Sequence, residues 1–585
     1  MFASFAGTIL TLIVVFLMFA GMIASIVAMS GDEEVKISDN TVLKITWTGE
    51  IRDRGSDNPF ENFDFATMQS KKPLGLYTIL KNIEKAGKDD RIVGIFLDME
   101  SIPAGMATSE EIRNKLLEFK ETGKFIVSYA NGYDQKAYYL ASLSDEIYLN
   151  KEGMMLFKGL NAQLMFFKNM LDKLDIEMQV VRGPNNKYKS AVEPLMRDHI
   201  SEANKEQMQS MLDSMWGKLL MAISESRGIS IDKLNEIADN LELSTADKAL
   251  EHNFIDGAVY RDEVIDILKK KVGIGEDDDL ETVSYSRYTK AKIKKTEGLK
   301  RDRIAVVFAE GAIVQGKTDG TNIGSSSTAK ALRKAHTNEK VKAIVFRVNS
   351  GGGDALASEI IRREVELATM KMPVIVSMGN VAASGGYWIS TNADYIFAQP
   401  TTITGSIGVF GVIPNMGKML EDKIGITMDN VMTNKNSDFI DVFKPLSPYQ
   451  HAKLDEVINK IYKDFTELVA ETRNLDIAYV DSIARGRVWS GVDAKKIGLI
   501  DGFGGIEEAI ALAAEKAELG ENYRITKYPK RKEFFEQLME EITGQSSQVY
   551  LRSELGDYYK YYQNLQTLKD MKGVQARMPF FMEIN

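Results

Sequence analysis

Short apolar runs rich in β-branched residues alternate along most of the chain with longer segments in which apolar and charged residues recur about every 3.6 positions. Ile304–Phe308, Ala343–Val348 and Pro373–Ser377 are runs of the first kind and predict buried strands. Glu359–Met370 and Pro448–Arg473 show the second pattern and predict helices with one solvent face. Because strands and helices alternate, we expect an α/β fold with a mostly parallel sheet.

The first thirty residues have a different pattern, because the first charged residue is Asp32 and Ile9–Met29 is almost entirely apolar. About twenty such residues cross a hydrocarbon core of ~30 Å as a helix. A cleavable signal peptide is the alternative, with small residues at Ala24 and Ala28 near a cleavage point. Such peptides usually carry a basic start and a shorter apolar stretch. We therefore expect residues 1–31 to form a membrane anchor helix.

Two parts of the chain resemble each other when the sequence is shifted by 249 residues, which takes Asn131 to Asn380. Residues 91–171 fall on 340–420 without a gap. Identical residues meet in register at many positions, including Tyr138 with Tyr387, Asp145 with Asp394 and Gly159 with Gly408. A match of this length indicates a tandem duplication of one domain of roughly 250 residues.

The duplication suggests where the domains begin and end. We place the N-terminal repeat at residues 40–276 and the C-terminal repeat at 304–525, with a linker at 277–303 between them. The linker is strongly charged, which is typical of a solvated connector. We expect residues 526–585, which are rich in aromatic residues, to form a helical tail that docks on the protein and has a strand-like end, or that contacts another subunit. A role at the membrane surface is a further alternative.

Composition removes several classes of function. The chain has no cysteine, which excludes a thiol nucleophile, a disulfide framework and a cysteine zinc site. It has four histidines, so histidine-based catalysis or metal binding has few candidates. The formal net charge of -10 argues against nucleic-acid binding, which needs a basic face to replace phosphate counterions. We expect neither a metal nor a cofactor.

The two repeats differ most clearly at Ser384, whose counterpart in the first repeat is Gln135. Ser384 has small neighbours and begins a predicted helix, so a substrate backbone could approach it and free N–H groups could face developing negative charge. A helix N-cap packed among glycines is the alternative. The loss of the serine in the other repeat favours a nucleophile.

A second difference is the run of three glycines within Asn349–Asp354, between a predicted strand and a predicted helix. Residues 99–105 of the first repeat lack it. The run suits either a phosphate cradle or an oxyanion hole, but it matches neither a Walker loop nor a dinucleotide-binding fingerprint. Plain turn geometry is the alternative.

A nucleophilic serine needs a base. Neither histidine of the second repeat, His336 or His451, lies in a segment that resembles a site. Asp394 is matched by Asp145 of the first repeat, which indicates a structural role for both. A lysine can act instead if burial, without a counter-charge, depresses its pKa.

The best candidate lysine is Lys189, which follows the predicted strand Met178–Val181 in the first repeat. The corresponding part of the second repeat lies near Asp438, so the repeats have lost complementary halves of a dyad. Lowering a lysine pKa from about 10.4 to about 7 requires roughly 4–5 kcal/mol, so the site must be dry. An ordinary solvated lysine, such as Lys187, is the alternative.

Taken together, these segments resemble the signal peptide peptidase A family in its long, duplicated (67K-type) form, within peptidase family S49. The resemblance covers nearly the whole chain. It is carried by Tyr188–Pro194, Val348–Gly353, Ala382–Trp388, Thr402–Gly408 and Gly486–Ser490.

The resemblance implies two tandem crotonase/ClpP-like repeats and a role for each site residue. Ser384 would attack a peptide carbonyl while Lys189 takes its proton, and Ser406 would orient the lysine amine. The oxyanion would be bound by backbone N–H groups around three glycines, Gly352, Gly353 and Gly385. Gly351 stands where the family turn usually has proline, which makes the turn less rigid and leaves the exact donor open.

The resemblance also implies a membrane-bound serine endopeptidase that degrades cleaved signal peptides and similar hydrophobic peptides through an acyl-enzyme. It would be a homotetramer attached to the bacterial inner membrane by its N-terminal helix, with the soluble part on the periplasmic side. Two alternatives are a catalytically decayed membrane scaffold and an acyl-CoA-binding enzyme of the crotonase type.

Overall fold

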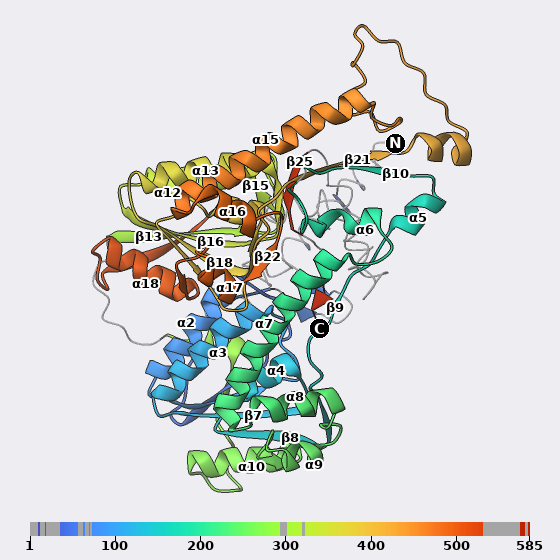
Figure 1. Ribbon diagram of the computed structural model, residues 1–585. Coiled ribbons are helices and arrows are strands. Elements are labelled where there is room, and N and C mark those ends of the chain that lie inside the picture. Colours follow the sequence, from blue (N-terminus) through green and yellow to red (C-terminus); the bar gives the residue numbers. More distant parts are fainter. Residues whose placement is uncertain are drawn as a thin grey trace.

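The computed structural model describes residues 35–55, 63–64, 69–70, 73–183, 185–292, 301–318, 322–530, 574–578 and 583–584, with isolated positions 7, 10, 11, 14 and 18. The anchor helix expected for residues 1–31 lies outside the described residues, apart from those five positions. No helix within the described ranges is both long and apolar enough to cross a bilayer. Figure 1 shows two α/β units, with the long helix α7 (Glu202–Arg227) running from the lower one toward the upper.

The first repeat is built on six parallel strands in the order β11-β8-β7-β6-β1-β12. These strands are β1 (Thr41–Ile45), β6 (Ile92–Asp98), β7 (Phe125–Asp134), β8 (Glu146–Leu156), β11 (Gly257–Ala258) and β12 (Thr282–Ser284). Besides α7, its main helices are α2 (Leu76–Lys88), α3 (Met106–Glu121), α4 (Gln135–Ala141), α8 (Ile231–Asn240), α9 (Ala246–Glu251) and α10 (Arg261–Val272).

The second repeat has the same order of parallel strands, β23-β19-β18-β16-β13-β24. These are β13 (Asp302–Glu310), β16 (Val341–Ser350), β18 (Val374–Ala383), β19 (Tyr395–Ala398), β23 (Gly502–Phe503) and β24 (Tyr523–Tyr528), and β20 (Ile403–Gly405) and β22 (Val488–Ser490) extend the sheet beyond β18. The helices are α12 (Ser325–His336), α13 (Ala355–Thr369), α14 (Gly385–Trp388), α15 (Pro448–Arg473), α16 (Ile477–Ile483), α17 (Gly491–Lys496) and α18 (Ile506–Lys516). The shared topology agrees with the duplication inferred from the sequence.

The predicted strands and helices of the second repeat are present, with some differences at their ends. The strands β13 and β16 contain the first two apolar runs and extend beyond them, and β18 begins one residue after Pro373 and extends beyond the third. Helix α15 begins and ends as predicted, whereas α13 begins at Ala355 rather than Glu359. The Asp354 side chain caps α13 by accepting a hydrogen bond from the Ala357 N–H at 2.7 Å, which fixes the earlier start.

The sequence predicts that the charged segment 277–303 is a solvated connector, but part of this segment is folded onto the first repeat. Its middle forms β12, parallel to β1, and the short helix α11 (Tyr285–Tyr288). The cause is a set of buried residues within the charged run, Val283, Tyr285 and Tyr288. The Tyr288 hydroxyl also donates to the Asp89 carboxylate at 3.1 Å, so part of the linker belongs to the first repeat.

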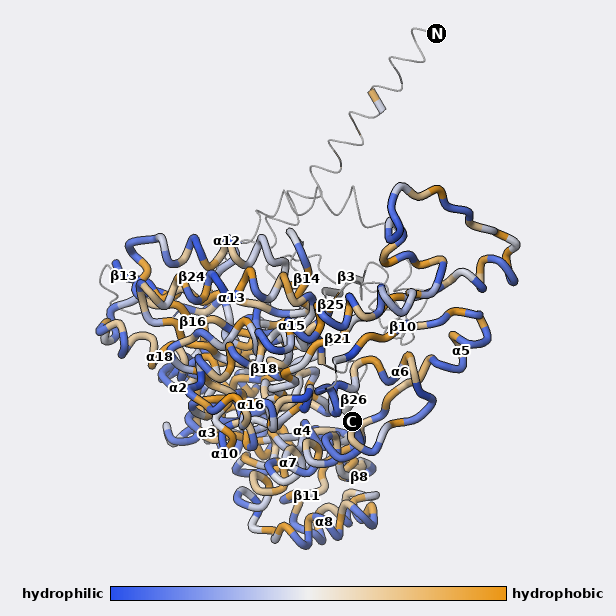
Figure 2. The backbone as a smooth tube through the Cα atoms, turned by 45° about the horizontal axis from the view of Figure 1, so that its top comes forward, coloured by the Kyte–Doolittle hydropathy of each residue, from blue (hydrophilic) through white to orange (hydrophobic). Residues whose placement is uncertain are grey.

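Both faces of the second sheet are buried. Ile304 and Val306 of β13 pack in a core formed largely by the first repeat, whereas Ala305 and Val307 pack in a core formed almost entirely by the second. This alternation follows from the period of two along a strand. Figure 2 shows hydrophobic residues gathered along interior strands such as β16 and β18. One of these two cores therefore contains side chains of both repeats.

A third sheet joins the repeats on another side. Its order is β10-β21-β25-β17-β14-β15. The strands are β10 (Glu177–Val181), β14 (Ile313–Val314), β15 (Ile323–Gly324), β17 (Gly352–Asp354), β21 (Phe410–Asn415) and β25 (Val574–Arg577). The first repeat contributes β10, which pairs antiparallel with β21 of the second. Part of the glycine run, expected to be a turn, is thus the short strand β17.

Shorter elements complete the described chain. They are β2 (Ile51–Arg52), β3 (Phe63–Asp64), β4 (Gln69–Ser70), β5 (Leu74–Gly75), β9 (Ala162–Gln163), α5 (Lys168–Lys173), a 3₁₀ turn at Ser190–Val192, α6 (Glu193–Met196), a π-helical turn at Met419–Ile424 and β26 (Glu583–Ile584). Most of the tail 526–585, expected to be helical, lies outside the described residues. Its described parts after residue 530 include the two short strands β25 and β26.

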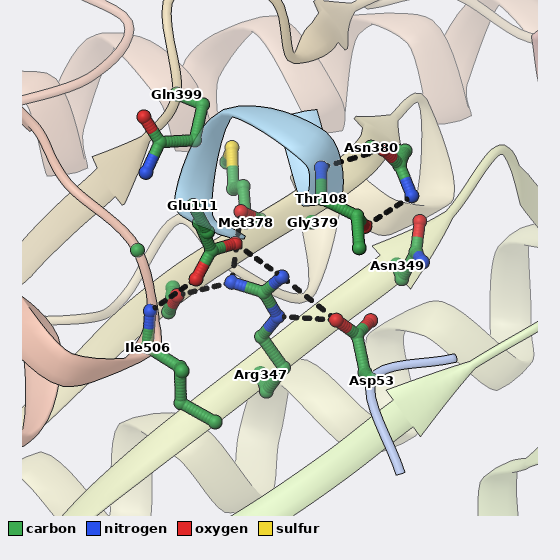
Figure 3. A network of polar contacts seen from close by, with 12 residues as sticks. Asp53, Thr108, Glu111, Arg347, Asn349, Met378, Gly379, Asn380, Gln399 and Ile506 are labelled. Carbon is green, nitrogen blue, oxygen red and sulfur yellow. Dashed lines mark hydrogen bonds and ion pairs between the residues drawn. The ribbon is translucent and has the colours of Figure 1, made fainter. Parts of the chain in front are cut away.

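A buried ionic network also fastens the repeats together (Figure 3). Arg347 on β16 is fully buried and pairs with Asp53 and with Glu111 of α3, each at 2.7 Å. The second Glu111 oxygen accepts the N–H of Ile506 at 2.9 Å. Burial raises the pKa of Glu111 to about 7, because two carboxylates share one guanidinium away from water. Removing Arg347 would leave both carboxylates without this partner.

Candidate active site

Ser384 lies at the junction between strand β18 and helix α14, in an unusual backbone conformation. Its φ of 55° and ψ of -115° are rarely adopted by a residue with a side chain. The Ser384 N–H donates to the Gly405 carbonyl at 2.8 Å, and its own carbonyl accepts from the Trp388 N–H at 2.8 Å. These bonds hold the strained residue in place, as is common for reactive groups. Its side chain is fully buried.

Lys189 comes from the first repeat and meets Ser384 of the second. The Lys189 Nζ lies 2.7 Å from the Ser384 Oγ, 2.9 Å from the Ser406 carbonyl oxygen and 3.1 Å from the Ser406 Oγ. Lys189 is fully buried and forms no ion pair with any described carboxylate. Burial penalises the charged amine and therefore lowers the pKa of Lys189 well below its ordinary value.

Counting donors and acceptors shows what a neutral Lys189 can do. A neutral amine has two N–H groups and one lone pair. The Ser406 carbonyl can only accept, and the Ser406 hydroxyl is within reach to donate to the Gly486 carbonyl at 3.3 Å, so each can accept one lysine N–H. The lone pair then faces the Ser384 hydroxyl, which is the arrangement that a general base requires.

The lysine segment is held by contacts that cross between the repeats. The Tyr188 N–H donates to the Arg485 carbonyl at 2.9 Å. Gln207 on α7 donates to the Tyr188 carbonyl at 3.0 Å and accepts from the Val488 N–H at 3.1 Å. Gly486 packs so closely that a Cβ built on it would lie 2.5 Å from the Lys189 Cβ. The amine is therefore positioned by the second repeat as well as by its own.

Of the three glycines expected to bind an oxyanion, Gly352 and Gly385 lie together beside Ser384, whereas Gly353 packs against Ile313 of β14. Gly352 has a φ of +96°, and a Cβ there would lie 2.7 Å from the Gly385 nitrogen, so both positions form one narrow wall. The Gly352 N–H donates to the Ser350 Oγ at 3.1 Å, which makes it the less available donor. Gly353 pairs with Ala576 of β25 in the third sheet. Which of the three glycines donates to an oxyanion stays a prediction.

Comparison with known proteins gives the relationship. The model of "Peptidase family S49" matches residues 118–275 and again 366–520. "Protease 4" of Salmonella typhi is 38% identical over 479 residues, which cover 80% of this chain and 76% of that one. The chain belongs to peptidase family S49.

Two further similarities accompany this result. "Serine protease SPPA, chloroplastic" of Arabidopsis thaliana is 34% identical over 498 residues, covering 84% of this chain and 71% of that one. A solved structure, that of ClpP1 from Listeria monocytogenes, matches with a TM-score of 0.23 and 16% identity over 34% of this chain and 91% of that one. As an S49 member the protein is a serine peptidase, and each repeat carries one family segment. The crotonase/ClpP-like form of the repeats stays a prediction.

The first repeat of this S49 peptidase has a different side chain at the position of Ser384. Gln135 donates to the Gly159 carbonyl at 2.8 Å and accepts from the Lys158 N–H at 3.2 Å. In the second repeat the matching carbonyl, that of Gly408, lies 3.4 Å from the Ser384 Oγ. The glutamine amide thus makes local backbone contacts where the serine faces a lysine.

Other residues considered from the sequence lie apart from this site. Asp438 contacts Lys444 and Gln450. His336 is buried against Glu364, and His451 pairs with Asp455 on an exposed face. Asp394 accepts the Val374 N–H at 2.7 Å, as Asp145 does for the Ile126 N–H in the first repeat, which agrees with a structural role. Over the described residues, no cluster of three or more His, Asp or Glu side chains is arranged to hold a metal.

Two positioning residues were missed by sequence reasoning. Gln207 lies in an ordinary amphipathic helix and carries no signal of its own. Gly486 lies within a segment that contributes to the family resemblance, but its contact with Lys189 depends on how the two repeats pack. A pattern along one segment does not contain that information.

Proposed function

We propose that this chain is a membrane-anchored serine endopeptidase in which Ser384 is the nucleophile and Lys189 the general base. The observation that carries the proposal is the 2.7 Å contact between the Lys189 Nζ and the Ser384 Oγ, buried from water and without a carboxylate partner among the described residues. Ser406 is the residue that orients the amine, and backbone N–H groups around Gly352, Gly353 and Gly385 stabilise the oxyanion.

The reaction follows from this arrangement. The Ser384 Oγ attacks the carbonyl carbon of a peptide bond while its proton passes to the Lys189 Nζ. The backbone N–H groups of the glycine wall stabilise the negative oxygen that forms. The Lys189 ammonium then gives the proton to the departing nitrogen, the C–N bond breaks and an ester remains on Ser384. Water attacks this ester with Lys189 again as base, and the acid product leaves.

The substrate, location and assembly are further parts of the proposal. We assign cleaved signal peptides and similar hydrophobic peptides as substrates, a single-pass anchor in the bacterial inner membrane, a periplasmic catalytic part and a homotetramer. Support comes from the apolar stretch Ile9–Met29 and from the family resemblance of the motifs. Membrane fractionation and light scattering of the detergent-solubilised chain test the anchor and the tetramer.

The dyad is tested by a fluorophosphonate probe and intact-mass spectrometry of the full chain. We expect one adduct on the wild type and none on Ser384→Ala or Lys189→Ala. Lys187→Ala is the matched control, because its amine is exposed two residues away, and it should label normally. The labelling rate should fall as the pH is lowered and Lys189 becomes protonated. Because burial lowers the pKa of Lys189, this fall should occur well below pH 10.5.

Each other outcome has a distinct meaning. Normal labelling of Lys189→Ala would contradict the lysine as base. No adduct on a folded wild type that also leaves peptides uncut would favour the decayed scaffold.

A further inference from the structure

Glu193 lies four residues after Lys189, at the start of the short helix α6, and its carboxylate faces the start of α7 (Figure 1). Only 5% of the residue is exposed. One carboxylate oxygen accepts from the Ser201 hydroxyl, and the other accepts from the Ser201 N–H at 3.3 Å and from the Asn204 Nδ2 at 3.0 Å. This buried carboxylate has no part in the proposed proton transfers.

The carboxylate fixes the direction of the hydrogen bonds that follow. It can only accept, so the Asn204 Nδ2 must face it and the Asn204 Oδ1 must face the other way, toward Gln207. The Gln207 Nε2 lies 2.9 Å from that oxygen and therefore donates to it. The Gln207 Oε1 is left to accept the Val488 N–H at 3.1 Å. Glu193 thus sets the orientation of both amides.

This relay of hydrogen bonds ends on both sides of Lys189. The Gln207 Nε2 lies 3.0 Å from the Tyr188 carbonyl oxygen and 3.0 Å from the Ser190 Oγ. These two residues precede and follow Lys189, so the Gln207 amide holds the backbone from which the lysine side chain extends. A reversed Gln207 amide would turn its oxygen toward the Tyr188 carbonyl, where two acceptors would meet. The orientation set by Glu193 therefore reaches the segment that carries the proposed base.

The second repeat contains a counterpart of the first part of this relay. Its helix α15 has 26 residues, as α7 does, and a shift of 246 residues brings the two helices into register and takes Asn204 to Gln450. The Gln450 Nε2 donates to the Asp438 carboxylate at 2.9 Å, as Asn204 donates to Glu193. A carboxylate that holds an amide at the start of a long helix is therefore common to both repeats.

The last part of the relay exists only in the first repeat. The same shift takes Gln207 to Lys453, whose exposed amine pairs with Glu456 on its own helix. The second repeat therefore lacks the residue that connects the start of the helix to the lysine segment. Because Gln207 accompanies Lys189 and is lost where the lysine is lost, the relay has a function beyond stabilising the helix.

We infer that Glu193 is a positioning residue for the peptidase reaction and acts on Lys189 through this relay. The inference rests on the proposed general base and adds a residue that holds it. Without an acceptor at Glu193, the Asn204 amide is free to rotate, and the change passes through Gln207 to the backbone at Lys189. A displacement of about 1 Å at a reacting group lowers the rate about 100-fold. The loss should appear in kcat with little change in KM, because the relay does not touch the substrate.

The test uses full-length variants, a fluorogenic peptide and the fluorophosphonate probe. Glu193→Leu removes the acceptor at similar volume and should lower kcat by about 100-fold. Glu193→Gln keeps an oxygen that can accept from Asn204 and should recover most of this loss. Asp438→Leu is the matched control, because it removes the corresponding carboxylate of the second repeat, and its kcat should be that of the wild type.

Intact-mass spectrometry separates positioning from misfolding. The fraction of chains labelled at completion counts the folded sites, and kcat is expressed per labelled site. A purely structural role of Glu193 would lower the labelled fraction and leave kcat per site unchanged, whereas the relay predicts a full fraction that is labelled slowly. If Glu193→Leu does not fold, Glu193→Asp applies the same criterion, because it keeps the carboxylate but withdraws it by one methylene group.

Three results would overturn the inference. They are a wild-type kcat per site in Glu193→Leu or in its replacement Glu193→Asp, an equal fall in Asp438→Leu, and no recovery in Glu193→Gln. Failure of the proposed dyad is recognised separately, because Lys189→Ala would then label normally. If the dyad holds and the relay fails, Lys189→Ala stays unlabelled while Glu193→Leu labels at the wild-type rate.

Discussion

Substitution of Gly486 by alanine tests the placement of Lys189 without touching either reacting group. Gly486 has a φ of +78°, which costs alanine about 1 kcal/mol. The new Cβ would lie 2.5 Å from the Lys189 Cβ and 2.6 Å from its Cα, about 1 Å closer than ordinary contact allows. Either the added methyl group stays overpacked, which lowers the unfolding free energy by about 1–3 kcal/mol, or the lysine segment moves.

A movement of the lysine has the larger effect on catalysis. A shift of about 1 Å would lengthen the 2.7 Å contact between Lys189 Nζ and Ser384 Oγ beyond hydrogen-bond distance. Misplacement on this scale costs about 100-fold in rate. We therefore expect kcat/KM of Gly486→Ala to fall by about two orders of magnitude, mainly in kcat, while the protein loses about 2–4 kcal/mol of unfolding free energy.

The control is Gly228→Ala at the end of α7. Gly228 has a similar φ of +69°, but no atom lies within 4 Å of the added Cβ. It should lose about 1 kcal/mol of stability and keep full activity. Urea unfolding and peptide cleavage measure both quantities. Full activity in Gly486→Ala would refute the view that this close contact positions the lysine.

Two further predictions concern the buried network between the repeats. Arg347→Met should lower the unfolding free energy by about 3–5 kcal/mol, because the buried carboxyl groups of Asp53 and Glu111 would lose the guanidinium that they share. Arg363→Met, at an exposed arginine, should change it little, and equal urea midpoints for the two variants would contradict this reasoning. Because the pKa of Glu111 is raised from 4.5 to about 7, the folded protein holds the extra proton between these values, so stability should fall as pH rises across that window, by up to about 3 kcal/mol. Glu111→Gln should flatten this part of the pH profile, and an unchanged slope would exclude Glu111 as its source.

The regular elements could be predicted because their signals are local. The apolar runs of β13, β16 and β18 and the periodicity of α15 each lie within one segment, and the structure contains all four elements. The linker was predicted to be solvated because most of its residues are charged, and the few apolar residues between them were not weighed. Tyr285 and Tyr288 are buried although most of their neighbours are polar.

The site was predicted in part because duplication supplies an internal comparison. Ser384 and Lys189 stand out as residues that one repeat has and the other lacks, and the structure brings them within 2.7 Å. Comparing repeats could not reveal β25, because a strand that completes a sheet between distant segments leaves no trace in its own composition. The positioning roles of Gln207 and Gly486 could not be predicted for the same reason, because their contacts form only when the two repeats pack together.

The sharing of the candidate site between the repeats has a consequence for gene dosage. Each repeat supplies what the other has lost, so the chain corresponds to two different subunits translated as one. Their ratio is fixed at one to one whatever the expression level, and dilution cannot separate them as it separates free subunits. A gene that encoded them apart would have to balance two products and tolerate unpaired copies of each. Fusion removes both problems, because every chain carries both Lys189 and Ser384.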